Sequence, residues 1–151
     1  MKEYAQPIRF GLATSGCLIA YFILLALFGK HTNIFYSLFN GIITGVGIYE
    51  SIRYFKAKNV MGFHYGNGFV AGLVTGGAAT LVFTLFFTVY ATELNTLFLK
   101  ELSSTWFHYY QHFEAIVFFT VAVMGFATTL VLTLTFMQWF KISNNLTRKK
   151  I

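Results

Sequence analysis

The sequence is dominated by long apolar blocks that contain no charged side chain. They cover residues 10–28, 34–49, 68–92 and 115–140. A helix needs about 20 apolar residues to cross about 30 Å of hydrocarbon, and the first, third and fourth blocks meet this length. The second block meets it if Glu50, Ser51 and Ile52 form its last turn, with the Glu50 carboxylate at the lipid headgroups. The sequence therefore predicts an all-α, polytopic membrane protein with four transmembrane helices, in which residues 1–151 form a single domain.

Composition and charge agree with a membrane class. The chain is 56% hydrophobic and only 11% charged, whereas roughly a quarter of the residues of a soluble domain are charged. Its 11 Lys and Arg outnumber its 5 Asp and Glu, but these charges lie beside the apolar blocks and form no separate basic domain. We therefore expect the lipid bilayer as a partner and no nucleic acid.

Orientation follows from the bias of Lys and Arg toward cytoplasmic loops. A cytoplasmic N-terminus leaves only Lys30 and Lys100 outside. It places the other nine of these residues inside: Lys2, Arg9, Arg53, Lys56, Lys58, Lys141, Arg148, Lys149 and Lys150. The sequence therefore predicts that both termini are cytoplasmic (N-in/C-in).

The two outer connections differ in length. The first, residues 29–33, is short enough to join the first two helices as an antiparallel hairpin. The second, residues 93–114, is longer, and its Leu94, Leu97, Phe98 and Leu102 recur at helical spacing. This spacing predicts a short amphipathic segment on the outer surface, where we expect any contact with an external partner.

Small residues recur every four positions along the third block. The row consists of Gly68, Gly72, Gly76, Thr80, Thr84, Thr88 and Thr92. Such a row lets another helix backbone approach closely. Its threonines either bond back to carbonyls one turn earlier and pack or form a polar path for a substrate.

The second block carries Gly41 and Gly45, which the predicted topology places at the same depth as the glycines of the third block. We therefore expect the Gly45 and Gly72 backbones to lie close together near the cytoplasmic side. The outer halves of these two helices are rich in aromatic residues, so we expect wider spacing there.

Ionisable and strongly polar side chains are sparse inside the apolar blocks. Glu50 lies one turn before Arg53, which fits an ion pair at a helix end, and Asn40 is the deepest strongly polar side chain. Asn40 fits a hydrogen bond between helices as well as it fits ligand binding. Ionisable groups within a membrane mark ion and proton paths, so their scarcity argues against a proton-coupled transporter.

Catalytic and metal sites are not expected. Ser15 and Ser37 have no nearby His or acid in the sequence, so we expect no catalytic residue, no cofactor and no enzyme activity. His108 and His112 are four residues apart, a spacing found in metal sites, but two histidines are at most half a site. We favour an aromatic interfacial segment as the explanation for them. We therefore expect no metal.

The single cysteine and a short internal similarity are the remaining features of the sequence. Cys17 is the only cysteine, so it cannot form an intramolecular disulfide. Residues 11–16 resemble residues 72–77, which leaves open whether a helical hairpin has been duplicated.

Residues 56–95 carry a resemblance to a known family. A basic inner loop is followed by Gly62-Phe-His-Tyr-Gly-Asn-Gly-Phe69, a glycine-rich span, and then Tyr90 and Asn95. In these features the chain resembles the domain of unknown function 4199 family, which consists of small bacterial four-span membrane proteins. The resemblance implies a bacterial inner membrane and assigns no catalytic residue.

Packing motifs outnumber chemical motifs in this sequence. We therefore expect a structural or accessory subunit that packs against another integral membrane protein or a second copy of itself. The alternative is an oligomeric transporter or channel for a small solute.

Overall fold

The computed structural model describes residues 5–30, 34–58, 63–94 and 113–140, and almost all of them are helical. The α-helices are α1 (Ala5–Leu27), α2 (Ile34–Lys58), α3 (Tyr65–Val89) and α5 (Phe113–Phe140), and the π-helix η1 (Tyr90–Leu94) directly continues α3. The all-α prediction is confirmed for this part of the chain. The predicted amphipathic segment, His108, His112 and the terminal lysines lie outside the described residues.

Three stretches of helix are long and apolar enough to cross a membrane. They are Ala5–Leu27, Tyr65–Glu93 and Phe113–Phe140. Outward-facing side chains on them are largely apolar, such as Leu85 and Phe119, which are 67% and 70% exposed. These helices fit a membrane protein.

The remaining helix, α2, is more polar than the other three helices, and it is longer than the sequence predicts. It has 25 residues and ends at Lys58, well beyond the apolar block that ends at Tyr49. Ile48, Ile52 and Phe55 are all buried, and their spacing of four and three residues places them on one face. This buried face keeps α2 packed against the other helices past the last apolar residue of the block.

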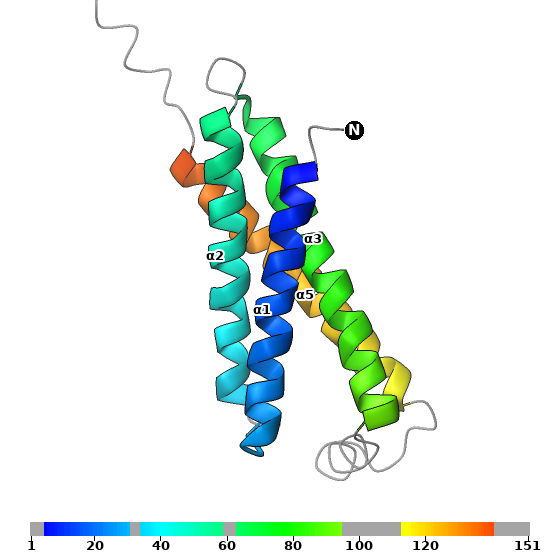
Figure 1. Ribbon diagram of the computed structural model, residues 1–151. Coiled ribbons are helices and arrows are strands. Elements are labelled where there is room, and N and C mark those ends of the chain that lie inside the picture. Colours follow the sequence, from blue (N-terminus) through cyan, green and yellow to red (C-terminus); the bar gives the residue numbers. More distant parts are fainter. Residues whose placement is uncertain (1–4, 31–33, 59–62, 95–112, 141–151) are drawn as a thin grey trace, which may run out of the picture.

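Helix α3 lies at the centre of the bundle and contacts α1, α2 and α5. Helices α1 and α2 run side by side, as Figure 1 shows. Helix α1 ends at Leu27, and Gly29, two residues later, has a left-handed φ of 64°. The Lys30 amide donates to the Leu25 carbonyl at 2.9 Å and the Gly29 amide to the Ala26 carbonyl at 3.1 Å, the pattern of a Schellman cap. The chain thus leaves α1 in a tight turn before it enters α2.

The bundle is closed at one end and open at the other. At the end where α2 and α5 finish, Ile48, Ile52, Met137 and Phe140 form a buried cluster. At the opposite end, where α1 finishes and α5 begins, the pair α1 and α2 diverges from the pair α3 and α5 (Figure 1). The two ends therefore differ in how much room they leave between the helices.

The row of small residues on α3 packs against α5. A Cβ atom added to Gly72 would lie 2.6 Å from Thr133 Cγ2 of α5, and one added to Gly76 would overlap the Thr129 side chain. The contact is reciprocal, because a Cβ on Gly125 of α5 would lie 2.5 Å from Thr80 Cγ2. Residues at four-residue steps on both helices thus interdigitate, as in ridges-into-grooves packing.

The expected pairing of Gly45 with Gly72 differs from the structure. Gly45 faces Leu132 and Phe136 of α5, at 3.7–3.8 Å from its Cβ position, whereas Ile52 is the α2 residue nearest Gly72, at 3.1 Å. The prediction was wrong about which residues meet. Thr133 of α5 fills the space in front of Gly72, and α2 reaches Gly72 only through Ile52, about two turns beyond Gly45.

A buried hydroxyl joins three helices at the closed end. Thr75 Oγ1 of α3 lies 2.6 Å from Ser51 Oγ of α2, 3.1 Å from the Pro7 carbonyl oxygen of α1 and 2.9 Å from the Ala71 carbonyl oxygen. Thr75 is fully buried and Ser51 is 1% exposed. Since a hydroxyl donates once and accepts twice, Thr75 can donate to a carbonyl while it accepts from Ser51.

Candidate functional site

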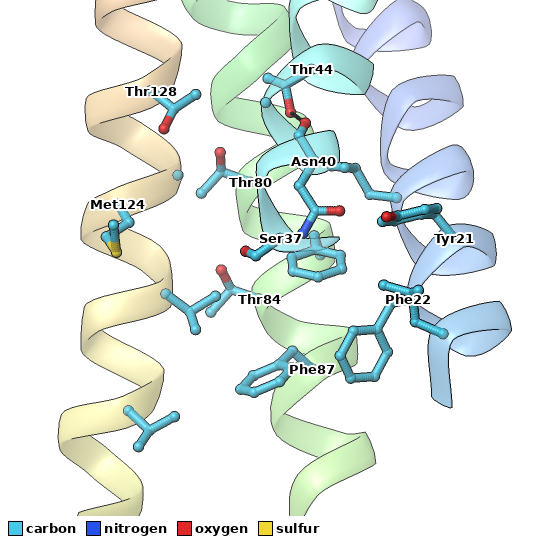
Figure 2. A pocket seen from close by; sticks show the side chains of 17 residues that line it. Tyr21, Phe22, Ser37, Asn40, Thr44, Thr80, Thr84, Phe87, Met124 and Thr128 are labelled. Atoms are coloured by element: carbon cyan, nitrogen blue, oxygen red, sulfur yellow. Dashed lines mark hydrogen bonds between the residues drawn. The ribbon is translucent and has the colours of Figure 1, made fainter. Parts of the chain in front are cut away.

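A cavity of about 340 Å³ lies between all four α-helices. Figure 2 shows the side chains that surround it. Its lining residues come from the later halves of α1 and α3 and the earlier halves of α2 and α5, so the cavity belongs to the end at which the helix pairs diverge. The lining consists of Leu18, Tyr21, Phe22, Leu25, Ser37, Asn40, Gly41, Thr44, Thr80, Phe83, Thr84, Phe87, Val117, Val121, Met124, Gly125 and Thr128.

Aromatic rings form the wall between α1 and α3. Phe22 of α1 contacts Phe83, Phe87 and Tyr90 of α3 edge to face, with ring centroids 6.2, 5.7 and 5.0 Å apart. Edge-to-face contacts hold rings in defined orientations. The aromatic residues expected to separate α2 from α3 thus pack differently: α1 supplies the main partner of the α3 rings, while Phe35 of α2 is 73% exposed.

Asn40, the strongly polar side chain of α2 that the sequence analysis singled out, lies at this cavity. The Asn40 amide extends from α2 into the space between the helices (Figure 2). Its Oδ1 atom is enclosed and has no hydrogen-bond partner among the described residues. The Asn40 backbone carbonyl, in contrast, accepts a hydrogen bond of 2.8 Å from the Thr44 hydroxyl. The side-chain amide therefore retains hydrogen-bonding capacity that the described residues leave unused.

Thr84 of α3 also has an enclosed side-chain oxygen without a hydrogen-bond partner among the described residues. The hydroxyls of Thr88 and Thr92 on the next two turns each donate to the carbonyl four residues earlier, at 2.9 Å. Thr84 Oγ1 makes no such bond, and its residue lines the cavity. Backbone bonding thus explains Thr88 and Thr92 but not Thr84.

Two other unpartnered hydroxyls have a packing explanation. Thr129 and Thr133 of α5 also lack partners among the described residues, but both fit against glycines of α3, with Thr133 Oγ1 2.9 Å from the Cβ position of Gly72. Such close approach of an oxygen to a glycine backbone is typical of Cα–H···O contacts between helices. Asn40 and Thr84 therefore stand apart as the unpartnered groups at the cavity.

The cavity carries no formal charge on its described lining residues. Its only phenol, that of Tyr21, donates a hydrogen bond of 2.9 Å to the Tyr36 carbonyl. Tyr21 therefore offers its ring, and not its hydroxyl, to an occupant. A charged molecule would find no countercharge here, which favours an uncharged one.

A shallow groove on the outside of the bundle adjoins the cavity. It lies between α2 and α5 and is lined mostly by apolar residues, among them Ile42, Val46 and Leu132. Gly41 and Thr128 line both the groove and the cavity. A Cβ added to Gly41 would meet no atom within 4 Å. Small residues therefore separate the cavity from the apolar surface between these two helices.

The residues singled out from the sequence fall into separate places. Gly68, Gly72, Gly76 and Thr80 lie in the contact with α5, and Gly45 faces α5 from α2. The cavity is lined by Gly41, Asn40 and Thr84, and also by Thr80. Glu50 and Arg53 form an ion pair of 3.2 Å, with side chains 45% and 64% exposed. This pair lies at the surface of α2 and contributes little to stability.

The packing of α5 against the glycines of α3 was not predicted. Gly125, Thr129, Thr133 and Met137 repeat every four residues, as the row on α3 does, and this shared period was the available signal. The cavity itself could not be read from a repeat, because its lining combines four helices.

Within the residues that the structure describes, no group of three or more His, Cys, Asp or Glu could hold a metal ion. No protein-family model, curated protein or solved structure matches the chain. The resemblance to the domain of unknown function 4199 family stays a prediction.

Proposed function

We propose that this chain is an integral membrane protein that crosses the bilayer four times, with both termini in the cytoplasm, and binds a small uncharged molecule between its two helix pairs. The cavity enclosed by α1, α2, α3 and α5 carries this proposal. Of the functions expected from the sequence, solute handling is the one that the cavity favours.

The character of the cavity supports binding. Ligand sites are typically concave, largely apolar and about 300–1,000 Å³ in volume, with a few polar groups that orient the ligand. This cavity has about 340 Å³, rings of Phe22 and Phe87 on its wall, and the polar side chains of Asn40 and Thr84. It therefore suits a molecule with an apolar body and few polar atoms.

Photolabelling in a bilayer tests the proposal. The full chain in lipid nanodiscs would be irradiated with a 2-naphthol derivative that carries a small diazirine, and the labelled residues would be located by mass spectrometry. We expect labels on cavity residues such as Val117 and Val121, which excess 2-naphthol removes. A molecule that merely dissolves in the lipid would instead label outward-facing residues, and excess 2-naphthol would not compete.

A matched pair of variants sharpens this test. Gly41→Leu places a large side chain where no atom lies within 4 Å of the Cβ position, at the edge of the cavity. Gly16→Leu makes the same change on α1, also with no atom within 4 Å, but away from the cavity. Gly41→Leu should abolish competed labelling and Gly16→Leu should preserve it. Equal labelling in both variants contradicts the proposal.

The accessory role, which is the first expectation from the sequence, is our second candidate function, in a bacterial inner membrane as the family resemblance implies. Much of the outward surface of α5 is apolar, including Phe119, Val131 and Trp139, and either lipid or another membrane protein could cover it. Purification from native membranes in mild detergent, followed by mass spectrometry, tests this role. A stoichiometric membrane partner would favour it, whereas the chain alone or as a homo-oligomer would not.

A further inference from the structure

We propose that the ligand of this cavity is a lipid-soluble, uncharged molecule whose polar group, a hydroxyl or an amide, forms a hydrogen bond with the Asn40 side chain. This inference rests on the proposed function and adds the chemical class of the ligand. It depends on the unused hydrogen-bonding capacity at Asn40 and Thr84 and on the largely apolar lining of the cavity.

The Asn40 amide provides the first step. Its Oδ1 atom is buried without a partner among the described residues, and leaving a buried polar atom unpaired is unfavourable. Rotation about the last side-chain torsion, which is broad in Asn, exchanges Oδ1 and the amide nitrogen at the cavity. The side chain can therefore donate to or accept from a ligand, and a hydroxyl or amide matches both possibilities.

Thr84 provides the second step. It lines the same cavity from α3, and its hydroxyl lacks the backbone bond that Thr88 and Thr92 form. Rotation about χ1 moves this hydroxyl among three positions, so it can turn toward a ligand without moving the helix. The cavity thus has a second polar side chain that a bound hydroxyl or amide could engage.

The residues around Asn40 and Thr84 indicate that the rest of the ligand is apolar. The lining is aromatic and aliphatic around these two groups, with Phe22, Phe83 and Phe87 on one side and Val117 and Val121 on the other. The adjoining groove between α2 and α5 is apolar and is separated from the cavity at Gly41 and Thr128. A molecule that dissolves in lipid can reach this groove, whereas an ion would remain in water.

Two probes of nearly the same shape test the polar contact. 2-Naphthol carries a hydroxyl, and 2-methylnaphthalene carries a methyl group in its place. Their binding to the full chain in nanodiscs would be measured by competition with the photolabel and corrected for partition into empty nanodiscs. Because a net hydrogen bond in a protein contributes about 1 kcal/mol, we expect 2-naphthol to bind about five- to tenfold more tightly.

Variants then assign the preference to residues. Asn40→Leu should reduce the preference for 2-naphthol to within about twofold, since a neutral hydrogen bond is then lost. Thr84→Val keeps the shape of the side chain and should reduce the preference in part, so the test survives if Asn40→Leu does not fold. Thr88→Val removes a hydroxyl that bonds only its own helix and should leave the preference unchanged.

Each outcome has a distinct meaning. Failure of both probes to bind in the cavity would reject the proposed function itself. Equal binding of both probes to the unmodified chain would overturn the inference about the polar group and leave the proposed function standing. A preference for 2-naphthol that survives both Asn40→Leu and Thr84→Val would also overturn it.

Discussion

At the scale of single residues, Gly76 shows why the row on α3 requires glycine. Its backbone lies so close to Thr129 that an added Cβ would overlap the Thr129 side chain, with Thr129 Cβ itself 2.9 Å away. A threonine is too short to bend out of the way, so helix α5 would have to shift.

Gly76→Ala should therefore destabilise the protein. Overpacking of a tight contact costs about 1–3 kcal/mol, and the better helix propensity of alanine returns up to about 1 kcal/mol. We expect a net loss of about 1–2 kcal/mol in the free energy of unfolding, measured by titration with SDS in mixed micelles. Gly16→Ala, with no atom within 4 Å of its Cβ position, should be neutral or stabilising. Equal effects of the two changes would contradict the contact.

Thr75 is the corresponding polar residue at the closed end. Thr75→Val keeps the shape but removes the hydroxyl that lies within 3.1 Å of Ser51 Oγ and the Pro7 carbonyl oxygen. Hydrogen bonds between membrane helices contribute about 0.6 kcal/mol on average, and loss of a hydroxyl that contacts two other helices should cost about 1 kcal/mol. Thr120→Val is the control, because the Thr120 hydroxyl is exposed and bonds only to the Ile116 carbonyl. In the same SDS titration it should change stability by much less than Thr75→Val.

At the scale of helices, the sequence predicts each element better than it predicts the partners of each element. The row Gly68, Gly72 and Gly76 indicates a close helix contact, and the structure has one. Its partner is α5 and not the predicted second helix. The spacing of glycines identifies a helix face that another helix can approach closely, but it does not identify which helix packs there. The threonines Thr129 and Thr133 fill it here.

The candidate site was predictable only in part. Asn40 stood out from the sequence because an amide within an apolar block is costly. Thr84 did not stand out from its neighbours in the threonine row, since all of them could bond the preceding turn. Only the packing of the helices shows that Thr84 lies at a cavity while Thr88 bonds to its own helix.

Lys56, in the last turn of α2, contacts the C-terminal end of α5. Lys56 Nζ donates to the Phe140 carbonyl at 3.3 Å and lies 5.6 and 5.5 Å from the ring centroids of Phe63 and Phe140. A cation at a helix C-terminus and over aromatic rings contributes about 0.5–1 kcal/mol. Lys56→Met should therefore lower the free energy of unfolding by about that amount in the SDS titration. Lys58→Met, at an exposed position, should leave the free energy of unfolding unchanged. Equal effects of the two substitutions would show that the loss of a positive charge, and not the loss of the Lys56 contacts, lowers stability.

At the scale of the whole molecule, the two ends of the bundle carry different kinds of residue. The closed end contains the Thr75 contacts, the cluster around Ile52 and Met137, and the Lys56 contact. The other end contains the cavity. Substitutions at the closed end should therefore change stability, whereas substitutions at Asn40 or Gly41 should change binding with less effect on stability.

The whole-molecule topology depends on α2, the most polar of the helices. Its 25 residues extend about 38 Å at 1.5 Å per residue, enough to cross about 30 Å of hydrocarbon. If α2 spans the bilayer, Lys30 before it and Lys58 at its end lie on opposite sides. If only the other three helices span it, both lysines lie on the same side.

Labelling of single cysteines in intact cells separates these two topologies. In a Cys17→Ser background, Lys30→Cys should react with a membrane-impermeant maleimide added outside, because the predicted orientation places this turn outside the cell. Lys58→Cys should react only after the membrane is permeabilised. Both lysines are exposed in the bundle, so packing does not shield either position from the reagent. Reaction of both cysteines in intact cells would mean that α2 lies on the outer surface, and reaction of Lys58→Cys alone would reverse the orientation.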